Sequence, residues 1–216
     1  MSMKKESTAN HGFTLIETMV AIAILLLAVA GPLVVASRAM IAAEIAQDQL
    51  TASNLAQEGI EYVRMMRDDE YLAAYQAGGT NVSITAWNNF LNNYDPSSNP
   101  ASVEGCRNTA CTLDLSATGG MGTGSGYSLM PCDIRKAGSC APLYLAPTGV
   151  YNESQTGTPT PFTRTIEVID TLAPGITPGN PYGNPYPDKR VVSTVSWLFQ
   201  GVSYSVTVTD QLTPWQ

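Results

Sequence analysis

The chain opens with a short polar segment, and a long run of apolar residues follows it. Residues 13–36 include a single charged side chain, that of Glu17. An α-helix over this run is about 36 Å long at about 1.5 Å per residue, whereas about 20 apolar residues already cross the hydrocarbon core of a bilayer. The pattern therefore predicts a membrane-spanning helix over residues 13–37.

An amphipathic pattern continues directly beyond this span. Between residues 50 and 75, apolar residues recur at steps of three and four, which places them on one face of a helix. That face consists of Ala52, Leu55, Ala56, Ile60, Val63 and Met66. We therefore expect the helix to continue over residues 38–76 and to pack on its own domain. Pro32 should kink it, because proline lacks a backbone donor and crowds the preceding turn. Gly59 is a second expected weak point.

The last third of the chain alternates between apolar and polar residues and is rich in Val, Ile and Thr, which is typical of an antiparallel sheet. We expect strands over residues 162–170, 190–199 and 202–212, with Gln200-Gly201 as a hairpin turn. A helix laid on one sheet face buries both apolar stripes. The candidates for that face are Ile166, Val168, Val192, Val195 or Trp197, Val206 and Val208.

Together these patterns predict an α+β fold in which a long amino-terminal helix packs on a carboxy-terminal antiparallel sheet. Residues 77–216 form the expected globular, loop-rich β domain. A short helix is expected around Ile84, Trp87, Leu91 and Tyr94. The Gly-rich segment from Thr118 lacks the Lys-Ser/Thr ending of a phosphate loop and is interpreted as a loop. The long segment 173–188 is interpreted as a surface lobe or a functional loop.

Charge and composition narrow the function classes. The net charge is −7 and charged residues make up 13% of the chain, so an acidic surface without a basic patch argues against a nucleic-acid site. The one histidine, His11, precedes the apolar run. No catalytic Ser-His-Asp or Cys-His set and no metal-spaced acidic set can be assembled after residue 12, so we expect no enzyme, cofactor or metal site. Asp68, Asp69 and Glu70 are interpreted as a solvated helix end.

All four cysteines lie downstream of the apolar run: Cys106, Cys111, Cys132 and Cys140. Their spacings do not match the paired C-x2-C pattern of zinc sites. Two disulfides in an exported domain are therefore expected. Four cysteines allow three pairings, of which the local one is favoured: Cys106 with Cys111, and Cys132 with Cys140.

Ordinary signal-peptide cleavage is the competing interpretation of the amino-terminal segment. Ala28-Val29-Ala30 fits the A-x-A cleavage pattern, and cleavage after Ala30 would release a secreted or anchored binding module. The apolar character resumes at Leu33, however, and the helical pattern continues to about Tyr75. A cleaved signal has no reason to be continuous with a long helix.

Residues 12–17, G-F-T-L-I-E, resemble the processing motif of bacterial type IV prepilins and pseudopilins. The resemblance implies a pilin-like fold and a leader, residues 1–12, which carries Lys4 and Lys5. It implies that a prepilin peptidase/methyltransferase cleaves between Gly12 and Phe13 and N-methylates Phe13. It also implies that Glu17, the fifth residue of the mature chain, acts in assembly with other pilin subunits in a helical filament.

The Glu17 carboxylate and the amine that cleavage would create at Phe13 have opposite charges and could neutralise each other. A carboxylate within a membrane costs about 2.5–3.5 kcal/mol at the bilayer centre on insertion scales, and a free amine at Phe13 would be costly as well. Our hypothesis is that Glu17 of an incoming subunit pairs with the Phe13 amine of a neighbour and sets the axial register, as the resemblance also implies. Alternatively, Glu17 pairs with the amine of its own chain or serves only as a marker for the peptidase.

The expected location follows from the same features. The lysines before the span favour a cytoplasmic amino terminus with the globular domain outside, although Glu6 and Arg38 weaken this charge bias. The precursor is then a single-pass membrane protein in contact with lipid, and the mature chain joins a cell-surface pilus or a pseudopilus. The cysteines and long loops favour a minor pilin over a major pilin or a pseudopilin. The role of the filament in adhesion, motility, DNA uptake or secretion stays open.

Overall fold

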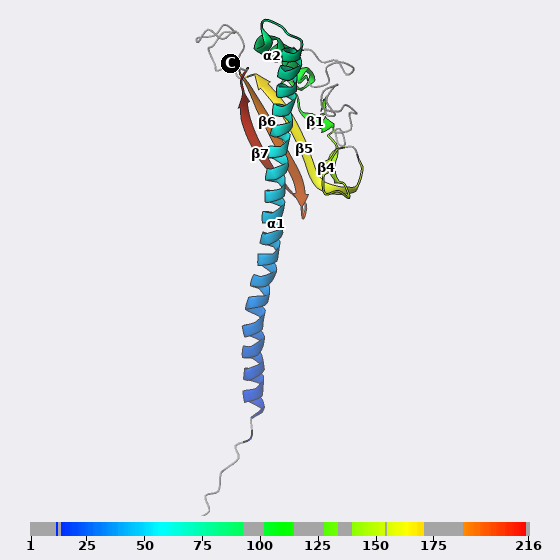
Figure 1. Ribbon diagram of the computed structural model, residues 1–216. Helices are drawn as coiled ribbons and strands as arrows, with labels where there is room; N and C mark the ends of the chain where they lie inside the picture. The colour runs from blue at the N-terminus through cyan, green and yellow to red at the C-terminus, as the bar shows by residue number, and fades with distance from the viewer. Residues whose placement is uncertain are drawn as a thin grey trace, which may run out of the picture. The chain divides into compact units, whose positions relative to one another are not determined.

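The computed structural model describes residues 12, 14–92, 102–114, 128–133, 140–153, 155–170 and 188–214 (Figure 1). The chain divides into two compact units, Met1–Gln47 and Asp48–Gln216. Phe13, Tyr94 and the segments predicted as loops over residues 118–126 and 173–187 lie outside the described residues.

Helix α1, Leu15–Gln76, is 62 residues long and runs through Pro32. Helix α2, Val82–Asn92, follows it after a short turn. That turn contains Gly78 at φ +73°, and left-handed glycine commonly follows a helix end because it has no Cβ to clash. No further α-helix occurs among the described residues.

The second half of α1 covers the sheet with the face that the sequence pattern predicted. Every residue of that face is buried, with at most 4% of its surface exposed: Ala52, Leu55, Ala56, Ile60, Val63 and Met66. Their partners include Ile166 and Val168 along one part of the helix, and Val195 and Trp197 along another. The long amino-terminal helix packed on an antiparallel sheet is therefore confirmed, and the fold is α+β and pilin-like.

The sheet is antiparallel at every described pairing between strands. Its central strand is β5, Thr158–Asp170, which pairs with β1, β3 and β6. The remaining strands are β1, Cys111–Asp114, β2, Ser128–Pro131, β3, Pro142–Leu145, β4, Tyr151–Asn152, β6, Lys189–Phe199, and β7, Val202–Leu212. Gln200 and Gly201 join β6 to β7 with φ values of +50° and +81°, as a two-residue type I′ hairpin turn requires.

Strand β5 begins four residues earlier than the sequence indicated, at Thr158 rather than Phe162. The missed part contains Pro159 and Pro161, which ordinarily argue against a strand because proline donates no ladder hydrogen bond. The pairing explains the exception. Strand β6 pairs with β5 only from Thr163 onward, so the first residues of β5 have β3 as their described partner and resemble an edge strand, where proline is tolerated.

The buried face of β6 differs from the expected one at Val192. Val191, Ser193, Val195 and Trp197 are buried, whereas Val192 lies on the opposite face and is half-buried. Side chains alternate between the two faces of a strand, so Val192 and Val195 cannot share one face. The expectation for Val192 was wrong for this reason. Val206 and Val208 do pack against the core from β7.

Glu70 corrects the expectation of a fully solvated acidic helix end. It is 8% exposed and hydrogen-bonded to Asn89 of α2. Burial raises the pKa of the Glu70 carboxyl, and the hydrogen bond from Asn89 partly opposes this shift. Glu70 thus belongs to the contact between α1 and α2 rather than to a solvated surface.

Gly59 is a point of close packing rather than a weak point of the helix. A Cβ at this position would lie 2.6 Å from Ser193 Oγ and 3.3 Å from Arg164 Cδ. We expect Gly59→Ala to destabilise the protein by about 1–3 kcal/mol through overpacking, which exceeds the gain of about 1 kcal/mol in helix propensity. Denaturant unfolding followed by tryptophan fluorescence measures this loss. Adding Ser193→Ala should restore part of the stability, and an unchanged loss in the double variant would contradict the steric explanation.

Candidate functional site

The start of α1 is shaped by a short capping motif. Gly12 and Thr14 are non-helical, and the helix begins at Leu15. The Glu17 backbone N–H donates to Thr14 Oγ1 at 3.3 Å, and the Thr18 N–H donates to the Thr14 carbonyl oxygen at 3.2 Å. Thr14 is therefore an N-cap residue. The sequence signal for it was present as the capping-box spacing T-x-x-E over residues 14–17, and the sequence analysis missed it.

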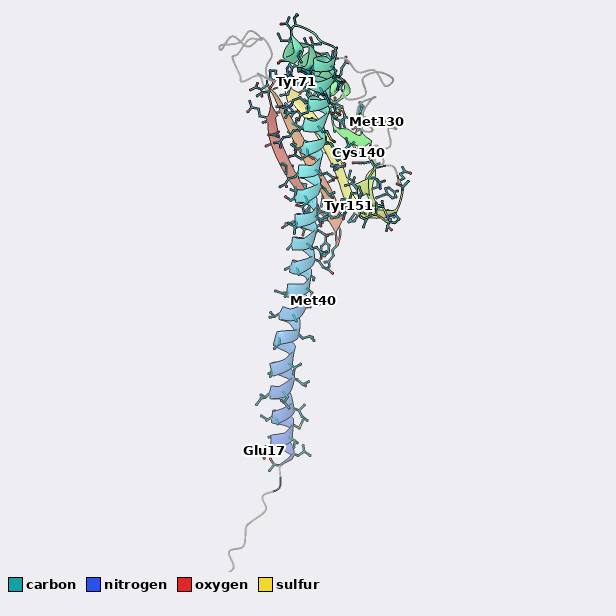
Figure 2. All side chains as sticks on the ribbon, viewed as in Figure 1. Glu17, Met40, Tyr71, Met130, Cys140 and Tyr151 are labelled. Carbon is teal, nitrogen blue, oxygen red and sulfur yellow. A yellow bond between two sulfur atoms is a disulfide. The ribbon has the colours of Figure 1, made fainter. Side chains whose placement is uncertain are left out.

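Glu17 lies in the first turn of α1, with its side chain exposed (Figure 2). A negative charge is favourable there because the amino-terminal end of a helix carries partial positive charge. Among the described residues, this carboxylate has no ion-pair partner. Glu17 is thus available to a cation from outside the described part of the chain.

The first unit presents an apolar helix surface that no described residue of the chain covers. Several of its large apolar side chains are 64–78% exposed, including Leu15, Leu25, Leu27 and Val35. The most apolar 18-residue window of α1 has a mean hydropathy of 2.8 and contains no buried residue. By length and composition, this helix can cross a membrane. Such a large exposed apolar surface requires lipid or another protein as its cover.

Helix α1 continues across the segment proposed for ordinary signal cleavage. Ala28, Ala30, Gly31 and Pro32 all lie inside it, so cleavage after Ala30 would cut the helix in its interior. A Cβ on Gly31 would have no neighbour within 4 Å, so packing among the described residues does not require glycine there. The kink expected at Pro32 stays a prediction.

A buried ionic cluster joins α1 to the sheet in the second unit. The Arg164 side chain on β5 is fully buried. Its Nη2 donates to Glu153 Oε1 at 2.8 Å and its Nη1 to Glu58 Oε2 at 2.9 Å. Nη1 also donates to the Leu55 carbonyl oxygen at 3.3 Å. Burial raises the pKa of the Glu153 carboxyl, and the adjacent guanidinium opposes this shift. The cluster holds the helix, β5 and the residue after β4 together.

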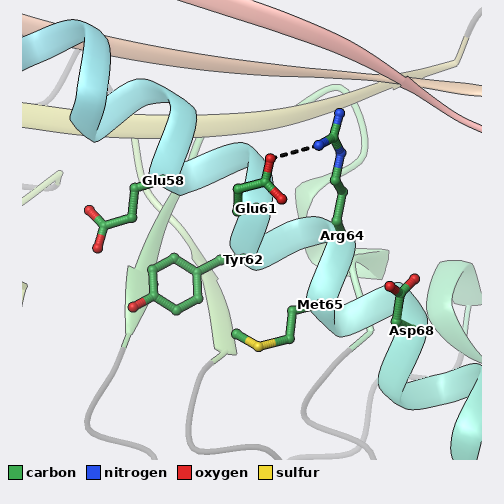
Figure 3. Close-up of a pocket in the computed structure, with 6 residues that line it drawn as sticks. All are labelled: Glu58, Glu61, Tyr62, Arg64, Met65 and Asp68. Carbon is green, nitrogen blue, oxygen red and sulfur yellow. Dashed lines mark hydrogen bonds and ion pairs between the residues drawn. The ribbon is translucent and has the colours of Figure 1, made fainter.

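A groove of about 490 Å³ flanks this cluster on α1 (Figure 3). It is lined by Glu58, Glu61, Tyr62, Arg64, Met65 and Asp68. Each of its three carboxylates already has an arginine partner: Glu58 pairs with Arg164, Glu61 with Arg64, and Asp68 with Arg67. No group of three potential metal ligands occurs among the described residues. The groove is therefore a set of satisfied ion pairs around one aromatic and one thioether side chain.

Two disulfides close the predicted local loops. Cys106 pairs with Cys111, and Cys132 pairs with Cys140. Cys106 and Cys111 are both fully buried, in a core cluster that also contains residues of α1, α2 and the sheet. Disulfides persist in oxidising compartments, which fits a domain that folds outside the cytoplasm.

Comparison with known proteins addresses the amino-terminal segment alone. Residues 7–31 match the family described as the prokaryotic N-terminal methylation motif. No significant match is found to a curated protein or to a solved structure. The matched residues include Gly12, Phe13 and Glu17 together with most of the apolar run that begins α1. The chain thus carries the amino-terminal signature of the type IV prepilin and pseudopilin family, on an α+β, pilin-like fold.

Proposed function

We propose that the chain is a type IV pilin-like subunit. The membrane holds it as a prepilin, a prepilin peptidase/methyltransferase cleaves it between Gly12 and Phe13 and methylates the Phe13 amine, and the mature chain then polymerises through α1. One observation carries this proposal: the G-F-T-L-I-E motif stands at the start of a helix whose most apolar stretch has no buried residue in the described part of the chain. One and the same surface suits lipid before assembly and neighbouring helices afterwards.

Glu17 has a defined part in this proposal. Cleavage creates a charged amine at Phe13, four residues before the carboxylate. Inside a polymer of apolar helices, either charge alone would be costly, whereas a close pair offsets much of the desolvation penalty. Glu17 of one subunit therefore pairs with the Phe13 amine of a neighbour and fixes their axial register. The exposure of Glu17 and its lack of an ion-pair partner in the described chain support this role.

The proposed organisation has four parts: a leader over residues 1–12, a membrane and polymer helix over 13–37, its amphipathic continuation over 38–76, and an external globular domain over 77–216. The leader stays in the cytoplasm, and the globular domain reaches the outside, where its disulfides form. Within this class we favour a minor pilin, because two disulfides and a multi-stranded sheet elaborate the domain. Quantitative mass spectrometry of filaments tests this choice: a minor pilin is substoichiometric to the main subunit.

The mass of the mature amino-terminal peptide tests the proposed processing. The full chain is expressed with a prepilin peptidase, and the membrane fraction is digested and analysed. We expect a peptide that begins at Phe13 and carries one methyl group, because the motif places the cut after Gly12. The matched control is Gly12→Val, which should keep the leader attached. A mature chain that begins at Gly31 would contradict the proposal and indicate ordinary signal cleavage.

A further inference from the structure

One cation interrupts the apolar surface of the first unit. Between Thr18 and Ala43 the only charged residue is Arg38. The next charge along the helix is the acid Glu44, and both side chains are exposed. Arg38 also opposes the charge bias that orients the span, because cytoplasmic rather than external flanks favour basic residues. Membrane topology therefore does not account for a basic residue at position 38.

Neither Arg38 nor Glu44 has an oppositely charged residue three or four positions away on its own helix. Side chains interact along a helix at spacings of three and four residues, and the residues at those spacings from Arg38 are all apolar: Val34, Val35, Ile41 and Ala42. Glu44 is six residues from Arg38, which corresponds to about 9 Å along the axis and about 120° around it. The two side chains therefore lie on different faces. Neither has an ion-pair partner among the described residues.

These two faces are complementary between copies of the chain. If parallel copies of α1 pack side by side through their apolar surfaces, an unpaired Arg38 or Glu44 is desolvated at a cost, whereas the two together offset that cost. Parallel helices displaced by six residues, about 9 Å, bring Arg38 of one copy level with Glu44 of the next. A contact between two different patches repeats from copy to copy and forms an open filament rather than a closed dimer.

We propose that Arg38 of one subunit forms an ion pair with Glu44 of an adjacent subunit, and that this pair defines a second axial contact besides that of Glu17. The inference rests on the proposed function, because it requires parallel packing of α1. It adds the identity of a second interface, its two residues and the displacement of neighbouring subunits. Both residues follow Pro32, so a kink there does not alter their relative positions.

A charge exchange in the full chain tests the pair. Arg38→Glu and Glu44→Arg should each lower incorporation into sheared filaments about tenfold or more, because each places like charges together. Combining both substitutions should restore incorporation to within about threefold of the original chain, because the opposite charges meet again. Ser37→Glu is the matched control for an added acid on a neighbouring face. A double variant no better than the single variants would overturn the proposal.

Cysteine cross-linking tests the contact without reversing a charge. Cells co-express two variants of the full chain, Arg38→Cys and Glu44→Cys, and mild oxidation should join position 38 of one copy to position 44 of another. The control pair is Arg38→Cys with Ala43→Cys, which turns the second thiol to another face. Equal cross-linking to positions 43 and 44 would overturn the proposal. An effect of Arg38→Glu on membrane insertion alone would also overturn it, because it would indicate that Arg38 pairs with lipid phosphate. A wild-type chain that is never cleaved after Gly12 would instead contradict the proposed function.

Discussion

Replacing Glu17 with Gln is expected to lower incorporation of the chain into filaments at least about tenfold while cleavage after Gly12 continues. In the proposed filament, the substitution leaves the Phe13 amine of the neighbouring subunit without a partner among apolar helices, and an unpaired charge there would cost several kcal/mol. The T-x-x-Q sequence that results still satisfies the capping-box pattern. The start of α1 at Leu15 should therefore persist, so that a loss of assembly reports the charge rather than the helix end.

Filament incorporation is measured as the sheared fraction relative to the membrane fraction, with the mass of the amino-terminal peptide recorded in both. Glu6→Gln is the matched control, because this acid lies in the proposed leader and would be removed with it. We expect Glu17→Gln chains to accumulate in the membrane in cleaved form. Normal incorporation of such chains would contradict the register role, and failure of cleavage would favour the alternative in which Glu17 marks the substrate for the peptidase.

Arg164→Met is expected to cost about 3–5 kcal/mol of folding stability, which is the range found when one partner of a buried ion pair is removed. The Glu153 side chain is 4% exposed and has its ion-pair partner in Arg164. Without the guanidinium, this carboxylate must remain buried and unpaired or take up a proton. Glu58 and the Leu55 carbonyl oxygen also lose a donor. The contact between α1 and β5 should weaken accordingly.

Denaturant unfolding of the full chain in detergent, followed by fluorescence of the buried Trp87 and Trp197, measures this loss. Arg64→Met is the matched control, because the Arg64 side chain is 41% exposed, in contrast to the fully buried Arg164. Exposed pairs contribute about 0–1 kcal/mol. Adding Glu153→Gln to Arg164→Met should recover part of the stability. A loss no larger than that of Arg64→Met would contradict the importance of the buried cluster.

The buried face of α1 was predictable because its periodicity is strong and is set by one partner surface. Six apolar positions at helical spacing identified the face, and all six are buried. The hairpin between β6 and β7 was equally predictable. Apolar and polar residues alternate in both strands, and the Gln-Gly pair marks the turn between them. Local patterns of this kind determine which side of an element is apolar, and the core follows from matching those sides.

Arg164 was missed although its position carried a signal. Every second residue of a strand has its side chain on the same face of the sheet. In β5 one such face contains Phe162, Arg164, Ile166 and Val168. The three apolar members are buried, so the arginine between them had to be buried as well. Its partner Glu153 could not be identified from the sequence, because it comes from a turn after β4 whose position depends on β3 and β5 pairing. The position of a residue along a strand therefore predicts whether its side chain is buried. The identity of its ion-pair partner depends on the tertiary structure.

Glu70 shows the limit of local reasoning in a different way. Three consecutive acids point in different directions on a helix, and that geometry alone suggested solvation. The packing of α2 against α1 covers one of the three and supplies Asn89 as its partner. The sequence indicated a short helix in this region but not the side of α1 on which it lies.

The attachment of α1 to the sheet has a mechanical consequence. The buried positions of α1 that pack with strand residues extend from Ala52 to Met66, about 21 Å along the axis, and the strands run beside this part of the helix (Figure 1). Two ionic links, Arg164 to Glu58 and Arg64 to Asp210, cross the same boundary. Tension applied along the helix would therefore load all of these contacts together in shear, instead of peeling the strands apart one at a time. A domain attached to its helix in this way resists a pulling force along the helix better than one whose strands can separate in sequence.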